Sequence, residues 1–65
     1  MRLYTVTFYM MNSRGTKLGG SPVVMKFYAG SDFNTEGLPF RRMLLEYGRA
    51  CGRSGSYVEI ISVEC

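Results

Sequence analysis

The chain has 65 residues, with eight Lys or Arg, five Asp or Glu and no His, so its formal net charge is +3. The lack of His and the presence of only two Cys exclude a structural zinc site. A hydrophobic fraction of 46% with 20% charged residues argues against disorder. We therefore expect one folded domain over residues 1–65, without a metal or another cofactor.

A domain of this size buries only about 60% of its extended-chain surface, so its stability is marginal. We expect self-association or docking on a larger partner to compensate. No apolar run approaches the roughly 20 residues that span a bilayer, and the N-terminus lacks a signal-peptide pattern. We therefore expect a cytoplasmic protein with no membrane contact. Because the chain starts with Met1 and its last predicted strand reaches Cys65, we also expect it to be complete.

The stretch Leu3–Met11 gives the strongest secondary-structure signal, because it joins aromatic, β-branched and long apolar residues without Gly or Pro. Alternate residues of a strand point to opposite faces. One face is wholly apolar, with Tyr4, Val6, Phe8 and Met10, and the other is half polar. This pattern predicts a central strand that is covered on one side only.

Residues 12–22 mix Asn, Ser, Gly and Pro and are predicted to form a loop. The alternation over Val23–Ala29 then predicts a second strand, antiparallel to the first. After a loop over residues 30–37, a helix is predicted over residues 38–51. Pro39 suits its first turn, and Gly52 suits a left-handed cap at its C-terminal end.

A third strand is predicted over Tyr57–Cys65, and its register stays open. Val58 and Ile60 belong to one face, whereas Ile61 and Val63 belong to the other. The order of the elements is therefore β-β-α-β, an α+β fold. Because the helix crosses the sheet, the third strand runs parallel to the second and pairs with the free edge of the first. This predicts a three-stranded antiparallel sheet in order 2-1-3, with one helix packed on one face.

The predicted helix has an apolar face made of Phe40, Leu44, Tyr47 and Cys51, which repeat at helical spacing and are expected to be buried. Gly48 lacks a side chain and permits a close approach to the sheet.

Leu45 is predicted to lie well away from this stripe, with Arg41 and Arg49 one turn to either side. It is either a lone exposed leucine, which is common, or an apolar contact residue through which the helix binds an acidic, grooved partner. In both cases Leu45→Asp is expected to leave folding intact.

The topology is predicted to bring residues 12–22 and residues 52–56 to the same end of the sheet. Gly-rich backbone with Arg and Lys suits phosphates or acidic side chains. The alternative is that these are ordinary polar loops whose cations complement the helix dipole. The basic end consists of Arg14, Lys17, Arg49 and Arg53.

The uncovered face of the sheet is predicted to carry Tyr9, Lys26 and Tyr28 among threonines and aliphatic residues. Tyr is enriched at protein contacts, so the leading interpretation is a dimer or partner interface. A plain solvated surface is the alternative. Tyrosines interleaved with Lys also suit the stacking of unpaired bases, although the aromatic signature of RNA-binding domains is missing.

Cys51 and Cys65 are predicted to be free thiols. The last strand runs away from Cys51 for about 8 residues, or roughly 26 Å, and a disulfide needs Cα atoms within about 7 Å. Cys51 is expected in the core.

No enzymatic site is predicted. There is no His to act as a base, and no nucleophile has an evident base partner. The acids Asp32, Glu36, Glu46, Glu59 and Glu64 are scattered over different elements, so they are not expected to act as a catalytic pair.

In its size and β-β-α-β layout, the chain resembles small accessory proteins encoded by bacteriophages, which bind and inhibit host machinery. The resemblance implies a non-enzymatic binding protein that blocks a host protein or complex, through the basic end with the help of the helix face or the open sheet. The alternative is a nucleic-acid or nucleotide binder that uses the same arginines and the sheet tyrosines. A third possibility is a structural subunit whose open face forms a homodimer or larger oligomer.

Overall fold

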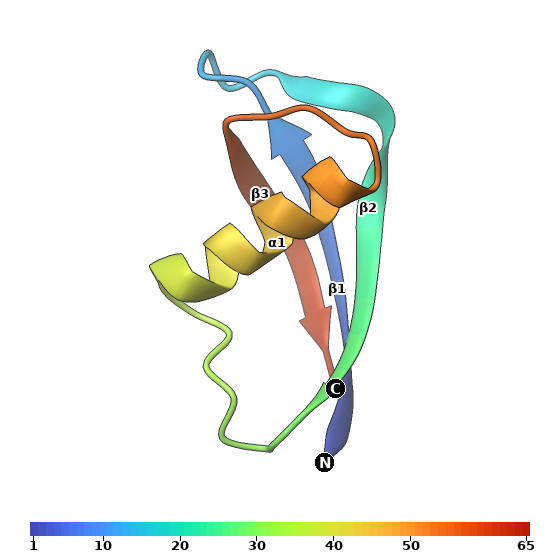
Figure 1. Ribbon diagram of the computed structural model, residues 1–65, viewed down its shortest axis with the longest axis vertical. Helices are drawn as coiled ribbons and strands as arrows, with labels where there is room; N and C mark the ends of the chain where they lie inside the picture. Colours follow the sequence, from blue (N-terminus) through green and yellow to red (C-terminus); the bar gives the residue numbers. More distant parts are fainter.

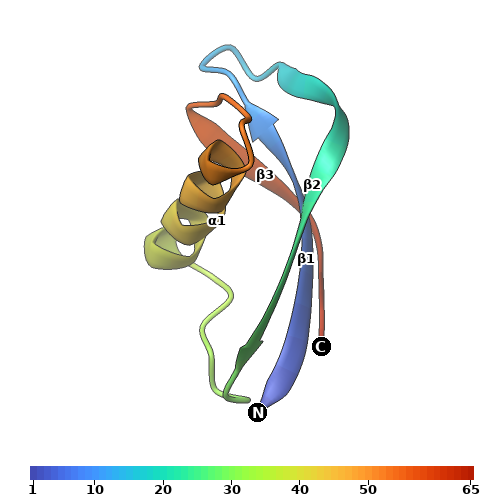
Figure 2. The same cartoon turned by 45° about the vertical axis from the view of Figure 1, so that its right-hand side comes forward.

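The computed structural model describes residues 1–65 and contains one sheet and one helix (Figure 1). β1 lies in the centre and pairs antiparallel with β2 on one side and β3 on the other, in the order β2-β1-β3. The helix α1 lies on one face of this sheet (Figure 2). The predicted α+β fold and strand order are thereby confirmed. The elements are β1 (Arg2–Met11), β2 (Lys17–Ala29), α1 (Leu38–Ala50) and β3 (Tyr57–Glu64).

The core lies between α1 and the sheet, and β1 supplies its centre. Val6, Phe8 and Met10 are fully buried, because their alternation points them all toward the helix. Leu44 of α1 is fully buried against them. The other members of the buried cluster are Val23, Phe40 and Val58.

Met10 sets the distance between α1 and the sheet. A Cβ atom on Gly48 would lie 3.0 Å from the Met10 Cε atom and closer still to its sulfur, and a Cβ atom on Gly55 would lie 3.1 Å from Cε. Real Cβ atoms essentially never come closer than 3.0 Å to such an atom and seldom closer than 3.4 Å, so the Met10 side chain occupies the space that the two glycines leave free. The predicted close approach at Gly48 is confirmed.

The end of α1 is a Schellman cap. Gly52 has a φ of 86°, the Arg53 N–H donates to the Gly48 carbonyl at 3.0 Å, and the Gly52 N–H donates to the Arg49 carbonyl at 3.0 Å. Cys51 stands at the cap and is exposed, as is the unpaired Cys65. The prediction of Cys51 in the core is wrong, because the chain leaves the helix there and Gly48 contacts the sheet instead.

β2 begins at Lys17, six residues earlier than predicted. A tight turn reverses the chain after β1: the Asn12 Oδ1 atom accepts hydrogen bonds from the N–H groups of Arg14 and Thr16, both at 2.9 Å. The register then jumps, because Phe8 pairs with Val23 whereas Met10 pairs with Leu18. Residues 19–22 therefore form a bulge inside β2, which is why their Gly-Gly-Ser-Pro sequence has the character of a loop.

A second bulge resolves the register of β3. Phe8 pairs with Ile60 and Thr7 pairs with Ser62, so Ile61 has no partner on β1. The extra residue shifts the alternation by one, so Ile60 and Val63 both belong to the α1 side of the sheet. Val58, Ile60 and Val63 therefore share the α1 side of the sheet, which a regular strand would not allow, and Ile61 is the extra residue of the bulge.

Phe33 is a core contributor that the sequence analysis missed. Its ring stands 5.2 Å from the ring of Phe27, 5.7 Å from Tyr4 and 6.0 Å from Phe40, measured between centroids. The Tyr4 hydroxyl also donates to the Gly30 carbonyl at 3.0 Å. These contacts hold the loop over residues 30–37 across the end of the core, opposite the basic end.

We expect Gly48→Ala to destabilise the protein by about 1–2 kcal/mol, because the strain of crowding fully buried Met10 exceeds the helix-propensity gain of about 1 kcal/mol. Urea unfolding followed by circular dichroism measures this difference. Gly20→Ala is the matched control, since nothing lies within 4 Å of its added Cβ atom. A Gly48→Ala protein as stable as the control contradicts the described packing.

Candidate functional site

The two connections at the basic end lie at the same end of the sheet, as predicted (Figure 1). Arg14 is exposed in the turn between β1 and β2. Arg49 belongs to the last turn of α1, and Arg53 follows the cap of the helix. The four cations thus share one end of the molecule, and the contacts of each decide what it can bind.

Arg53 ties the loop after α1 to the bulge of β2. Its Nη1 atom donates to the Ser21 carbonyl at 2.8 Å, and its Nη2 atom donates to the Ser21 Oγ atom at 3.2 Å. A Cβ atom on Gly19 would lie 2.6 Å from Nη1, so the guanidinium rests directly on the glycine backbone. Two of its donor groups are thereby engaged within the chain.

Arg49 and Lys17 also have partners inside the chain. The Arg49 Nη2 atom donates to the Gly55 carbonyl at 3.0 Å. The Lys17 Nζ atom stands 4.5 Å from the centre of the Tyr9 ring, a cation–π contact on the uncovered side of the sheet. The basic end is therefore a series of separate local contacts, and Arg14 is its most freely presented cation.

A groove of about 310 Å³ opens between α1 and the start of β3. Val58 is buried and Leu45 half-buried, so these two residues form its apolar floor. Arg41 and Arg42 are exposed along its side, and Leu38 is 65% exposed at its end. The full lining is Leu38, Arg41, Arg42, Leu45, Ser56, Tyr57 and Val58.

The structure corrects the prediction for Leu45. The side chain packs against the core cluster instead of standing well away from it. The reason is that β3 lies beneath this side of α1, so the helix buries a broader stripe than its most apolar residues indicate. Leu45→Asp would place a carboxylate against the core, so we expect it to destabilise the fold and not to leave folding intact.

Sequence reasoning placed Arg41 and Leu45 in a site but missed Leu38, Arg42 and Tyr57. A usable signal was present on the helix. Residues 38, 41, 42 and 45 follow the i, i+3, i+4, i+7 spacing of one helix face. No comparable signal marks Tyr57, because its place in the groove depends on how β3 pairs with β1.

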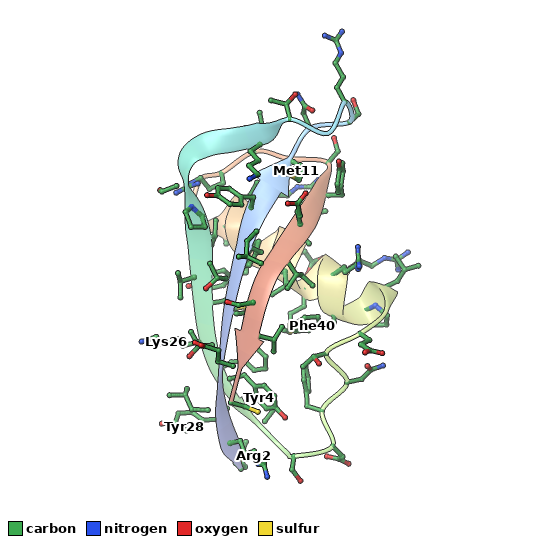
Figure 3. All side chains as sticks on the ribbon, turned by 180° about the vertical axis from the view of Figure 1, so that it is seen from behind. Arg2, Tyr4, Met11, Lys26, Tyr28 and Phe40 are labelled. Carbon is green, nitrogen blue, oxygen red and sulfur yellow. The ribbon has the colours of Figure 1, made fainter.

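The uncovered face of the sheet is seen in Figure 3, with Lys26 and Tyr28 on the edge strand β2. Tyr28 and Lys26 are exposed. Tyr9 is half-buried, and Lys17 stands over its ring. Of the two tyrosines, Tyr28 therefore presents the freer ring to a ligand.

No group of three or more His, Cys, Asp or Glu residues is placed to hold a metal ion. The helix α1 has neither the length nor the apolar character needed to cross a bilayer. Comparisons with protein-family models, with curated proteins and with solved structures find no match to this chain.

We expect Arg53→Ala to lower the free energy of unfolding by about 1 kcal/mol, because two exposed hydrogen bonds to Ser21 are lost. Amide hydrogen exchange at residues 19–21 should become faster, which localises the effect to the bulge. Arg14→Ala removes the same charge from the turn and should change neither quantity. If both variants behave like the unmodified chain, Arg53 does not hold the bulge.

Proposed function

We propose that the chain is a non-enzymatic binding protein whose α1–β3 groove holds a segment of another protein, one with an apolar side chain flanked by carboxylates. The observation that carries this proposal is the helix face over residues 38–45. It presents two leucines with two arginines between them, beside an edge strand.

The apolar floor of the groove suits the apolar side chain of such a segment, and the arginines along its side suit the carboxylates. An apolar side chain that enters against Leu45 and Val58 leaves water, which is worth about 1.5–3 kcal/mol for a residue such as Leu. Arg41 and Arg42 each offer a planar fork of donors that matches a carboxylate. Their charge also attracts an acidic segment and repels a basic one.

β3 adds a second element of recognition. It pairs with β1 on one side only, so the backbone groups on its outer edge have no strand partner. An extended segment in the groove can add to this edge by main-chain hydrogen bonds, while its side chains reach the pocket and the arginines. Backbone pairing supplies affinity, and the groove supplies selectivity.

The resemblance to phage accessory proteins favours a particular kind of partner. On that basis the segment belongs to a host protein, which is blocked by occupation of its binding site in the host cytoplasm. Arg14 and Lys17 extend the positive surface beyond the groove and serve as secondary contacts. Nucleic acid is the competing ligand, and the experiment below distinguishes it.

The probes are two short peptides of equal length, one alternating Glu with Leu and one alternating Lys with Leu, titrated into isotope-labelled protein and followed by NMR. We expect the acidic peptide to shift the amide signals of residues 38–45 and 56–58, and the basic peptide to leave them in place. Arg41→Glu with Arg42→Glu should lower the affinity for the acidic peptide by about tenfold or more, because charge attraction becomes repulsion.

Arg14→Glu with Lys17→Glu is the matched control, with the same change of charge at the basic end; because these two residues are only secondary contacts, it should weaken binding of the acidic peptide less than the groove variant does. If this control abolishes binding and the groove variant does not, the basic end is the site and the groove proposal is wrong. Equal amide shifts with the acidic and the basic peptide would also contradict the groove proposal. Salt-sensitive binding of a single-stranded oligonucleotide in place of the acidic peptide would identify the nucleic-acid alternative.

A further inference from the structure

One face of the sheet has no cover, and it carries large apolar side chains. Leu3 is 42% exposed, Val24 47% and Tyr28 68%. α1 lies on the other face of the sheet, so the helix does not cover these residues (Figure 2). In a chain of 65 residues with a core of seven buried side chains, covering this face would add substantially to the buried apolar area.

The charges on this face are sorted by strand. Thr5 in the centre pairs with Lys26 on β2 and with Glu64 on β3, so these three residues form one row across the sheet. Four residues further along β1, beyond the uncharged row at Thr7, the face carries a second charged row: Lys17 stands over Tyr9, and Glu59 pairs with Tyr9 from β3. The basic side chains thus lie on one edge strand and the acidic ones on the other.

We propose that two copies of the chain pair through this face, about a twofold axis parallel to β1. Such an axis places β2 of one copy over β3 of the other. It leaves the position of each row along the strand direction unchanged. Lys26 then meets Glu64 of the second copy, and Glu64 meets Lys26. Lys17 and Glu59 match in the same way, and the threonines and apolar residues of the two faces pack between them in an aligned sheet-on-sheet arrangement.

The charge pattern selects this axis over the alternative. A twofold axis perpendicular to the strands would place β3 over β3, so Glu64 would meet either itself or Glu59 of the second copy. Like charges in such positions oppose association. Of the two face-to-face arrangements, the one parallel to β1 brings every charged row onto its opposite.

The size of the face sets the strength of the pairing. β1 has ten residues, roughly 33 Å, and the edge strands stand roughly 10 Å apart. This is a small surface beside the ~800 Å² per partner of standard stable complexes, so we expect a reversible dimer in the micromolar range. The α1–β3 groove lies on the opposite side of the sheet and stays open in both copies, so the inference does not depend on the proposed function.

Sedimentation equilibrium over a range of concentrations tests the dimer with complementary charge reversals. Lys26→Glu and Glu64→Lys should each weaken self-association by more than about tenfold, since the symmetry doubles every like-charge contact. An equimolar mixture of the two variants should form a heterodimer, because one copy then presents only carboxylates at these positions and the other only ammonium groups. Arg14→Glu and Glu36→Lys, outside the face, should leave the dimer unchanged.

The unmodified chain remaining monomeric at millimolar concentration would overturn the proposal. So would single variants that still dimerise, or a mixture that fails to associate while circular dichroism shows both variants folded. The neutral variants Lys26→Gln and Glu64→Gln provide a milder second series. They should weaken the dimer less than the reversals and give only a partial rescue on mixing, because the heterodimer restores one of the two Lys26–Glu64 contacts; a rescue as strong as that of the reversals would contradict the charge pairing.

Discussion

The contact of the Met10 side chain with the backbones of Gly48 and Gly55 determines how the helix lies on the sheet. Glycine at these positions lets the C-terminal half of α1 and the following loop approach closely. At the other end of the helix, the rings of Phe33 and Phe40 fill the space beneath it. The groove opens beside this N-terminal half, where β3 begins, so the shape of the candidate site follows from which residues separate the two layers.

The single helix covers only one face of the sheet. The proposed functional surfaces are the groove beside this helix and the face of the sheet that it does not cover. On the helix side, Arg41 and Arg42 stand beside an apolar floor and an edge strand, which suits an acidic segment with an apolar side chain. On the other side, lysines on β2 and glutamates on β3 make the uncovered face complementary to itself. Because the two surfaces face opposite ways, occupation of one leaves the other accessible, and a dimer would present two grooves.

Local sequence was sufficient to predict the strands, the helix, the strand order, the Gly52 cap and the role of Gly48, because periodicity and glycine placement are local signals. The errors arise where distant contacts decide the structure. Residues 19–22 have the composition of a loop but lie within β2, where Arg53, which is 32 residues away in the sequence, binds Ser21. The register of β3 depends on a bulge at Ile61, and the burial of Leu45 depends on β3 passing beneath it.

The most direct test of this account is a nuclear Overhauser measurement on protein labelled at the methyl groups of its five methionines. The account predicts strong cross-peaks from the Met10 methyl group to the α-protons of Gly48 and Gly55, since the structure places these groups in contact. A Met10 methyl group with no cross-peak to either glycine would mean that α1 does not approach the sheet at this end. The groove would then have a different shape from the one on which the proposed function depends.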